Sequence, residues 1–351
     1  MILLYECLPT TIETHVTRLR TPLTKLIGID IPIVQAPMSS AATPTLAAAV
    51  SNAGGLGMIS GTWQQADELR RLIRDVKSQT ERPFGVNLGL DWEQEERLGL
   101  CLDEGVSVIS LFWGDPAPYV RQAHDGGAVV LHTVGSSEQA RSAVDAGVDV
   151  LVAQGWEAGG HVDSMVGNLA LIPAVVDVAG AVPVVAAGGI ADGRALAAVL
   201  ALGAAGAWVG TRFLLTHEAR AHEHYKSRLL SATESDTAFS TVFDVGWPDA
   251  PHRTLRNSTV DLWEAAGRPE MGDRPGEEQV LGEYDDGTPI VRYAVGFPRP
   301  GASGDVDAMA LYAGQGVGQA TSIQHAADVV RDLAREAQRV LLETSEQFVP
   351  E

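Results

Sequence analysis

The chain has little cysteine and little positive charge, and each shortage excludes a class of protein. Its 351 residues contain two cysteines, Cys7 and Cys101, too few and too far apart for a disulfide framework or a metal site, so both thiols are expected to be incidental. Only 25 lysines and arginines stand against 45 acidic residues, a formal charge of -20. Because phosphate backbones are bound by clustered basic side chains, we expect no nucleic-acid partner.

A long hydrophobic run is also missing. The apolar start, Met1 to Leu4, is followed by Glu6, and it has neither the basic flank of a signal peptide nor the length of a membrane span. We therefore expect a cytoplasmic protein that does not enter a membrane.

What the chain does contain is 45% hydrophobic residues, enough for a large core, in short apolar strands that alternate with helical patterns. The eight predicted strands are Pro32–Ala36, Leu56–Ser60, Phe84–Leu88, Val106–Leu111, Ala128–Thr133, Val148–Ala153, Pro183–Ala187 and Ala207–Gly210. This alternation indicates an α/β protein with parallel strands, and eight units are the number that closes into a TIM (β/α)8 barrel. The alternative is a doubly wound open sheet, which needs a switch point that no strand here marks.

The composition changes after a predicted helix at Glu218–Leu230. Residues 231–309, here called the acidic segment, hold fifteen acidic residues, six arginines and no lysine, in a loop-like pattern rich in Pro and Gly. Because the segment also carries several Trp, Phe and Tyr residues, we expect it to pack over the barrel mouth as a lid or subdomain. A helix over about Thr321–Thr344 should then pack against the barrel.

The predicted division is therefore an N-terminal extension (1–30), a barrel (31–230), the acidic segment (231–309) and a C-terminal segment that returns to the barrel (310–351).

Glycine-rich turns follow the seventh and eighth strands, where barrels of this kind bind phosphate. The turns are Ala187-Gly188-Gly189-Ile190 and Trp208-Val209-Gly210-Thr211. Their backbone N–H groups, a helix N-terminus beginning near Ala191 and the hydroxyl of Thr211 are suitable donors to an anion. The alternative is that these glycines serve only the conformation of the turns.

Polar side chains end two other strands. Asn87 ends the third strand and Gln154 the sixth, and because a buried amide must be hydrogen-bonded, a ligand with ring heteroatoms is a natural partner. The alternative is that both amides only tie loops together. His161 follows a flexible loop after the sixth strand, in which Gly159 and Gly160 let the backbone approach a ligand closely. We therefore expect His161 to point at a bound molecule.

Other histidines and one serine are further candidates for site residues. His132, at the end of the fifth strand, is expected to face the active side of the barrel, and Ser110 and His132 are the candidate substrate contacts. His222 and His224 do not share a helix face, so no metal site is expected.

Taken in order, these residues resemble the nitronate monooxygenase family, also called 2-nitropropane dioxygenases, which are barrels that bind flavin mononucleotide (FMN). The resemblance covers about residues 31–230 and 311–318 and is carried by Gln35-Ala36-Pro37-Met38, Gly85-Val86-Asn87-Leu88, Ala153 to His161, Ala187-Gly188-Gly189-Ile190 and Val209-Gly210-Thr211-Arg212-Phe213. It implies that His161 is the catalytic base. It also implies that FMN is held by Ala36, Pro37, Met38, Asn87, Gln154, Gly159, Gly160, Gly188, Gly189, Trp208, Val209, Gly210, Thr211 and, from a returning loop at 312–316, Gln315.

The implied activity is oxidation of alkyl nitronates or nitroalkanes with O2, in which a neutral His161 removes the α-proton. The chain departs from some members at His132-Thr133, where they have a lysine, and its acidic segment is longer than in compact members. Two alternatives stay open. Flavin-dependent enoyl-acyl-carrier-protein reductases share the barrel and use a nicotinamide, although an acidic surface would repel their acidic carrier; the other alternative is a flavin-binding protein without activity. The expected partners are a small-molecule substrate and O2, in a monomer or a homodimer.

Overall fold

The computed structural model describes residues 19–347, in which eight parallel strands form one sheet. Cys7, the apolar start and most of the predicted N-terminal extension lie outside the described residues, as do residues 348–351. The strands are β1 (Ile33–Gln35), β2 (Gly57–Ser60), β3 (Phe84–Gly89), β4 (Val108–Phe112), β5 (Val129–Val134), β6 (Val150–Gln154), β8 (Val184–Ala187) and β9 (Gly206–Val209).

Their order is β1-β9-β8-β6-β5-β4-β3-β2, and the last strand, β2, lies beside the first, β1. Leu56 donates its N–H to the Ile33 carbonyl at 2.9 Å and accepts the N–H of Gln35 at 2.9 Å, so β1 also pairs beside β2. The predicted TIM barrel is confirmed.

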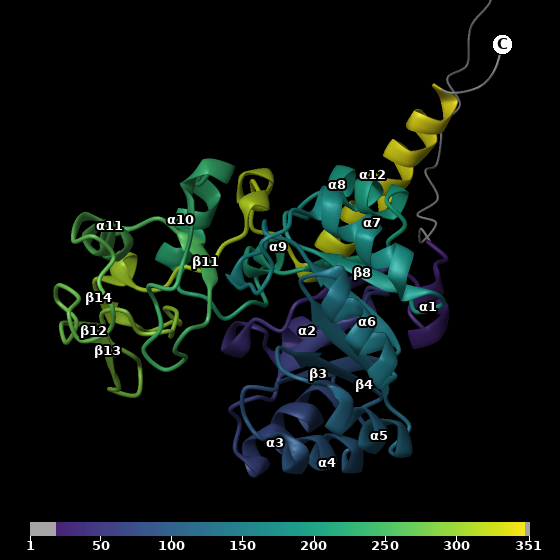
Figure 1. Cartoon of the computed structure of the whole chain (residues 1–351), viewed down its shortest axis with the longest axis horizontal. Coiled ribbons are helices and arrows are strands. Elements are labelled where there is room, and N and C mark those ends of the chain that lie inside the picture. Colours follow the sequence, from purple (N-terminus) through teal and green to yellow (C-terminus); the bar gives the residue numbers. More distant parts are fainter. Residues whose placement is uncertain (1–18, 348–351) are drawn as a thin grey trace, which may run out of the picture.

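Helices cover the outside of the sheet (Figure 1). They are α2 (Pro44–Asn52), α3 (Ala66–Lys77), α4 (Glu95–Asp103), α5 (Ala117–Asp125), α6 (Ser137–Ala146), α7 (Asn168–Ala179) and α8 (Gly193–Ala201). A short helix, α9 (Thr211–Leu214), follows β9, and the helix predicted at Glu218–Leu230 is α10 (Glu223–Ser231). Strand-to-helix connections thus meet at one end of the barrel, where the site is built.

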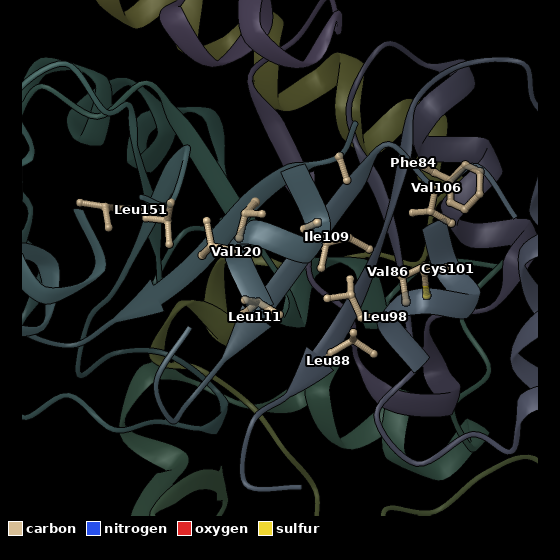
Figure 2. Packing of buried hydrophobic residues seen from close by; sticks show 14 of the residues in the cluster. Phe84, Val86, Leu88, Leu98, Cys101, Val106, Ile109, Leu111, Val120 and Leu151 are labelled. Carbon is tan, nitrogen blue, oxygen red and sulfur yellow. The ribbon is translucent and has the colours of Figure 1, made fainter. Parts of the chain in front are cut away.

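Two apolar layers hold the barrel together. Figure 2 shows part of the outer layer, in which Val86, Ile109 and Leu111 of the strands pack against Leu98 and Cys101 of α4. Burial raises the pKa of the Cys101 thiol to about 12, so it behaves as an apolar side chain.

The inner layer fills the barrel with alternate strand residues, among them Val34, Met58 and Leu131. Leu23 and Ile27 of α1 (Pro22–Ile27) pack on these residues, so an apolar plug occupies the barrel below the site.

The acidic segment is not loop-like throughout, which corrects the sequence analysis. It contains β10 (Thr237–Ser240), β11 (His252–Leu255), α11 (Ser258–Ala265), β12 (Val280–Glu283), β13 (Pro289–Val291) and β14 (Ser303–Gly304). These strands have two to four residues each, too few to show an alternating pattern in the sequence. In Figure 1 they form a lobe beside the barrel.

One strand of this lobe comes from the barrel itself. Gly160 and His161 form β7, which pairs antiparallel with β11 so that His161 lies opposite His252. The loop after β6, expected to be flexible, is therefore fixed to the acidic segment by backbone hydrogen bonds.

Charge is buried inside the lobe. The Arg274 side chain is 2% exposed, forms ion pairs with Asp244 and Glu277, and lies 4.4 Å from the ring centroid of Tyr293. Phe243 and Trp263 pack in the same small core, which gives the aromatic residues of the segment a structural role.

The C-terminal segment returns to the barrel through η4 (Gln315–Gln319) and ends in α12 (Ala326–Glu346). Val329, Val330 and Leu333 of α12 pack into the layer formed by α2 and α8, although the helix begins five residues later than about Thr321. Within residues 19–347, no helix has the length and apolar character needed to cross a membrane.

Candidate active site

A cavity of about 700 Å³ lies between the carboxyl ends of the strands and the acidic segment. This volume is in the range of small-molecule sites, about 300–1,000 Å³. The barrel contributes strand-end side chains such as Asn87, Gln154 and Trp208, and the acidic segment contributes Trp247 and Phe297. The cavity is therefore a joint product of two regions that are far apart in the sequence.

Most of the site residues proposed from the sequence lie at this cavity, and some do not. Its walls include Ala36, Pro37, Met38, Asn87, Gln154, Gly159, Gly160, His161, Trp208, Gly210 and Thr211. The lining does not include Gly188, Gly189, Val209, Gln315, Ser110 or His132.

The turn after β8 is shaped by packing. Gly188 has a φ of +105°, and a Cβ there would lie 2.8 Å from the Ala158 nitrogen, so glycine is required by a close backbone approach. The following helix, α8, begins at Gly193, within two residues of the predicted start near Ala191, and its first amides donate to the carboxylates of Glu336 and Asp192. Protein carboxylates thus accept from the first amides of α8, and the backbone of the Gly188-Gly189 turn stays the proposed phosphate contact.

The turn after β9 differs. Its helix, α9, begins at Thr211, and its N-cap residue Gly210 makes no side-chain capping bond. Both residues line the cavity, and the Thr211 hydroxyl accepts the N–H of Gly314 at 3.0 Å. Of the two predicted anion sites, this one has backbone donors beside the cavity.

The returning loop lies against the loop after β6. A Cβ on Gly159 would lie 2.3 Å from the Gly314 nitrogen, and Gln315 donates its backbone N–H to the Glu157 carbonyl at 2.9 Å. Gln315 is thus near the site without lining the cavity, because the Glu157 carbonyl holds its backbone against the loop.

The two strand-end amides are held in matching ways. Asn87 donates through Nδ2 to the hydroxyl of Ser110 at 3.2 Å, and Gln154 donates through Nε2 to the His161 carbonyl at 3.1 Å. Neither side-chain oxygen has a hydrogen-bond partner among residues 19–347, which leaves two acceptors at the cavity. Ser110 is fully buried behind Asn87, so it orients that amide and does not reach the cavity, which corrects its assignment as a substrate contact.

His132 is also misplaced by the sequence analysis. Its neighbours Val130 and Val134 pack in the layer between sheet and helices, whereas Leu131 faces the barrel interior. Because side chains alternate along a strand, His132 points toward the helices and Thr133 takes the place at the cavity. Burial lowers the pKa of His132 to about 4.

His161 lies among three aromatic rings. Its imidazole stacks on Trp247 with ring centroids 4.1 Å apart and an interplanar angle of 29°, and the rings of Tyr312 and His252 lie at 5.5 and 5.6 Å. Its Nε2 atom is covered and has no hydrogen-bond partner in the described part of the chain. Burial, with a smaller effect of His252, lowers the pKa of His161 well below its ordinary value of 6.5, so the ring is neutral at neutral pH.

His252 is a neighbour that the sequence did not reveal. Its Nε2 accepts the N–H of Phe243 at 3.1 Å, so the proton is on Nδ1, which donates to the Ala250 carbonyl at 2.9 Å. Both ring nitrogens are used in the neutral form, and burial lowers the pKa of His252 to about 4. It therefore presents an uncharged edge to His161.

A cluster of aromatic rings surrounds Trp247, and we call it the tryptophan wall: Trp63, Trp92, Phe112, Trp113 and Trp247. The indole N–H of Trp247 donates to the Asp91 carboxylate at 2.7 Å, which ties the acidic segment to the loop after β3. No sequence pattern could reveal this wall, because its members come from the ends of β2, β3 and β4 and from the acidic segment, which meet only in the folded chain.

Comparison with known proteins shows which family the chain belongs to. The sequence model of nitronate monooxygenase matches residues 20–97 and 88–336, which is most of the chain. The chain belongs to the nitronate monooxygenase family. Members of this family are flavin-dependent oxidoreductases, and the chain is an enzyme of that kind.

The proteins that this chain is similar to carry names of more than one reaction. A nitronate monooxygenase of Pseudomonas aeruginosa is 34% identical over 89% of this chain and 98% of its own length. A (3aS,4S,5R,7aS)-5-hydroxy-7a-methyl-1-oxo-octahydro-1H-indene-4-carboxyl-CoA dehydrogenase of Mycobacterium tuberculosis is 42% identical over 72% of this chain and 70% of its own. Among solved structures, FabK from Thermotoga maritima superposes with a TM-score of 0.77 at 31% identity, covering 94% of this chain and 100% of that one.

Proposed function

We propose that the chain is an FMN-dependent monooxygenase that oxidises alkyl nitronates and nitroalkanes with O2, using His161 as the base. The observation that carries the proposal is the state of His161, a neutral imidazole that lines the cavity and stacks on Trp247. A nitroalkane is a carbon acid, and its α-proton can be taken only by a base that is unprotonated at the working pH.

The cavity fits FMN on two independent observations. One of the unpartnered oxygens of Asn87 and Gln154 can accept the single N–H of a flavin ring, and the small apolar wall of Ala36 and Pro37 leaves room for a flat ring system. The uncapped turn at Gly210 and Thr211 then suits the phosphate end. When bound, FMN supplies the redox chemistry, which is acceptance of electrons from the substrate and their transfer to O2.

The chain's own residues prepare and move the proton. Trp247 holds the His161 ring by stacking, and the Gln154 amide bonds to the carbonyl of His161, so ring and backbone are both positioned. The His161 imidazole would take the α-proton, and the resulting imidazolium would stabilise the nitronate anion beside it. The covered surroundings exclude water and strengthen that attraction.

Substitution of His161 by Asn tests the base directly. For a neutral nitroalkane such as nitroethane, kcat/KM of H161N should fall by about 10²–10⁴, whereas turnover of ethylnitronate, which has already lost the proton, should fall far less. Flavin absorbance of the purified variant serves as the control for cofactor retention. Equal turnover of nitroethane by H161N with full flavin content would show that His161 is not the base.

A second candidate is dehydrogenation of a ring-bearing acyl-CoA, favoured by the 42% identity to the Mycobacterium tuberculosis enzyme. Its first step would also use His161, because the carbon next to a thioester carbonyl is a carbon acid. A formal charge of -20 opposes the approach of a polyanionic CoA ester. Anaerobic flavin bleaching by an acyl-CoA, but not by nitroethane or ethylnitronate, would favour this candidate.

The likeness to FabK makes a nicotinamide-dependent reductase a third candidate, and the same anaerobic bleaching experiment tests it. Rapid anaerobic bleaching by NADH or NADPH, followed by reoxidation with a crotonyl ester, would favour it over the monooxygenase. Slow bleaching by both nicotinamides, with nitrite released from nitroalkanes in air, supports the proposed reaction.

A further inference from the structure

The tryptophan wall makes one part of the cavity chemically distinct from the rest. Around Trp63 and Trp247 the lining adds glycines, threonine hydroxyls and His161. The charged side chains at the cavity, within the described residues, are Asp286 and Arg299, and they pair with each other at 3.7 Å in the β12–β13 part of the acidic segment. Arg299 also lies over the Tyr284 ring, 3.9 Å from its centroid. A ligand against the wall therefore meets apolar rings.

The rings of the wall are held in place by one another and by one hydrogen bond. Trp247 is 6% exposed and contacts Trp63, Trp92 and Trp113 with ring centroids 5.7, 4.9 and 5.3 Å apart. The bond from its indole N–H to Asp91 fixes the plane of the central ring. A rigid apolar surface of this kind binds flat or cyclic groups at low cost in conformational entropy.

Strain in the backbone supports the same conclusion. Trp113 has a φ of +63°, a conformation that residues other than glycine rarely adopt, and it directly follows Phe112 at the end of β4. Such conformations are kept where the surrounding structure demands them. At the same wall Trp63 remains 47% exposed, which leaves a large apolar face uncovered.

We propose that the tryptophan wall is a subsite for a ring, and that the substrates are carbon acids whose acidic carbon belongs to, or is attached to, a carbocyclic or aromatic ring. This inference rests on the proposed function, because the acidic carbon must lie at the imidazole of His161. The His161 ring stacks on Trp247, so the group attached to that carbon lies beside the wall. A small nitroalkane would leave the face of Trp63 in water.

The pair nitrocyclohexane and 2-nitropropane tests this inference, since both are secondary nitroalkanes and they differ by the three further carbons that close the ring. Each added methylene that is buried contributes about 0.8 kcal/mol, and enzymes convert one methylene into about 10–200-fold discrimination at most. We expect the holoenzyme to prefer nitrocyclohexane by about tenfold or more in kcat/KM. Equal kcat/KM values for the two compounds would overturn the subsite.

Variants of Trp63 test whether the tryptophan wall causes the preference for nitrocyclohexane. Trp63→Ala should reduce the ratio of the two kcat/KM values to about threefold or less, whereas Trp63→Phe, which keeps a ring, should retain most of it. Circular dichroism and flavin content identify a variant that has failed to fold. A ratio unchanged in both W63A and W63F would show that the ring binds elsewhere.

A binding measurement separates this inference from the proposed reaction. Cyclohexanecarboxamide and isobutyramide are neutral, unreactive analogues of the two substrates, and their affinities for the holoenzyme can be measured by titration calorimetry. We expect cyclohexanecarboxamide to bind about tenfold more tightly, and W63A to remove the difference. If that holds while no nitroalkane is turned over, the proposed function fails and the subsite stands; equal affinities would overturn the subsite whatever the reaction.

Discussion

The barrel and the acidic segment contribute to one cavity by different means. The barrel places side chains at strand ends, where a regular alternation decides which residues face inward. The acidic segment uses short strands, a buried arginine with two carboxylates, and aromatic rings. We propose that the barrel holds the cofactor and that the acidic segment shapes the substrate side. If so, the two regions should respond differently to mutation.

The largest expected effect is the loss of the buried cation in the acidic segment. Arg274→Ala leaves Asp244 and Glu277 without their partner, and breaking a buried ion pair in this way costs about 3–5 kcal/mol. We expect the segment to become sensitive to limited proteolysis while the barrel keeps its helical circular dichroism. Arg256→Ala, which removes exposed ion pairs with Asp261 and Glu264, is the matched control and should change stability by about 0–1 kcal/mol. Unfolding of the whole chain in R274A would show that the two regions are one cooperative unit.

A smaller effect is expected where the two regions are tied together. Asp91→Ala removes the acceptor of the Trp247 N–H, so the indole loses its anchor and His161 loses a fixed neighbour. We expect kcat for a neutral nitroalkane to fall about tenfold, in keeping with the net value of about 1.5 kcal/mol for a hydrogen bond to a charged group. Asp91→Asn keeps an acceptor oxygen and should restore most of the rate. If D91A and D91N are equally slow, the carboxylate acts in another way.

The smallest effect concerns pH. Burial and His252 lower the pKa of His161, so the neutral, active form persists to lower pH than for a free imidazole, and the rate should fall only as pH drops through that lowered pKa. We expect kcat/KM for nitroethane to stay nearly level from about pH 8 to 6.5, with its acid limb below the ordinary value of 6.5. Ethylnitronate, which needs no base, provides the control profile. An acid limb at or above pH 6.5 would contradict the buried environment of His161.

The sequence predicted the barrel because its signals are local and repeated. Eight apolar strands, each followed by a helical pattern, identify the fold, and all eight appear within a few residues of their predicted bounds. Strand ends such as Asn87 and Gln154 could be placed at the cavity because a barrel brings all its strand ends together. The same rule misplaced the side chain of His132, because a shift of one residue along a strand moves a side chain to the opposite face of the sheet.

What the sequence alone determined is therefore the barrel, its family and the strand-end residues, all of which depend on patterns within a few residues of one another. Only the tertiary structure decided the surroundings of His161. Trp247, His252 and Tyr312 reach it from distant parts of the chain, and the pairing of β7 with β11 brings them there. Contacts of this kind leave no local signal, because they arise from the packing of the acidic segment on the barrel and not from the periodicity of either.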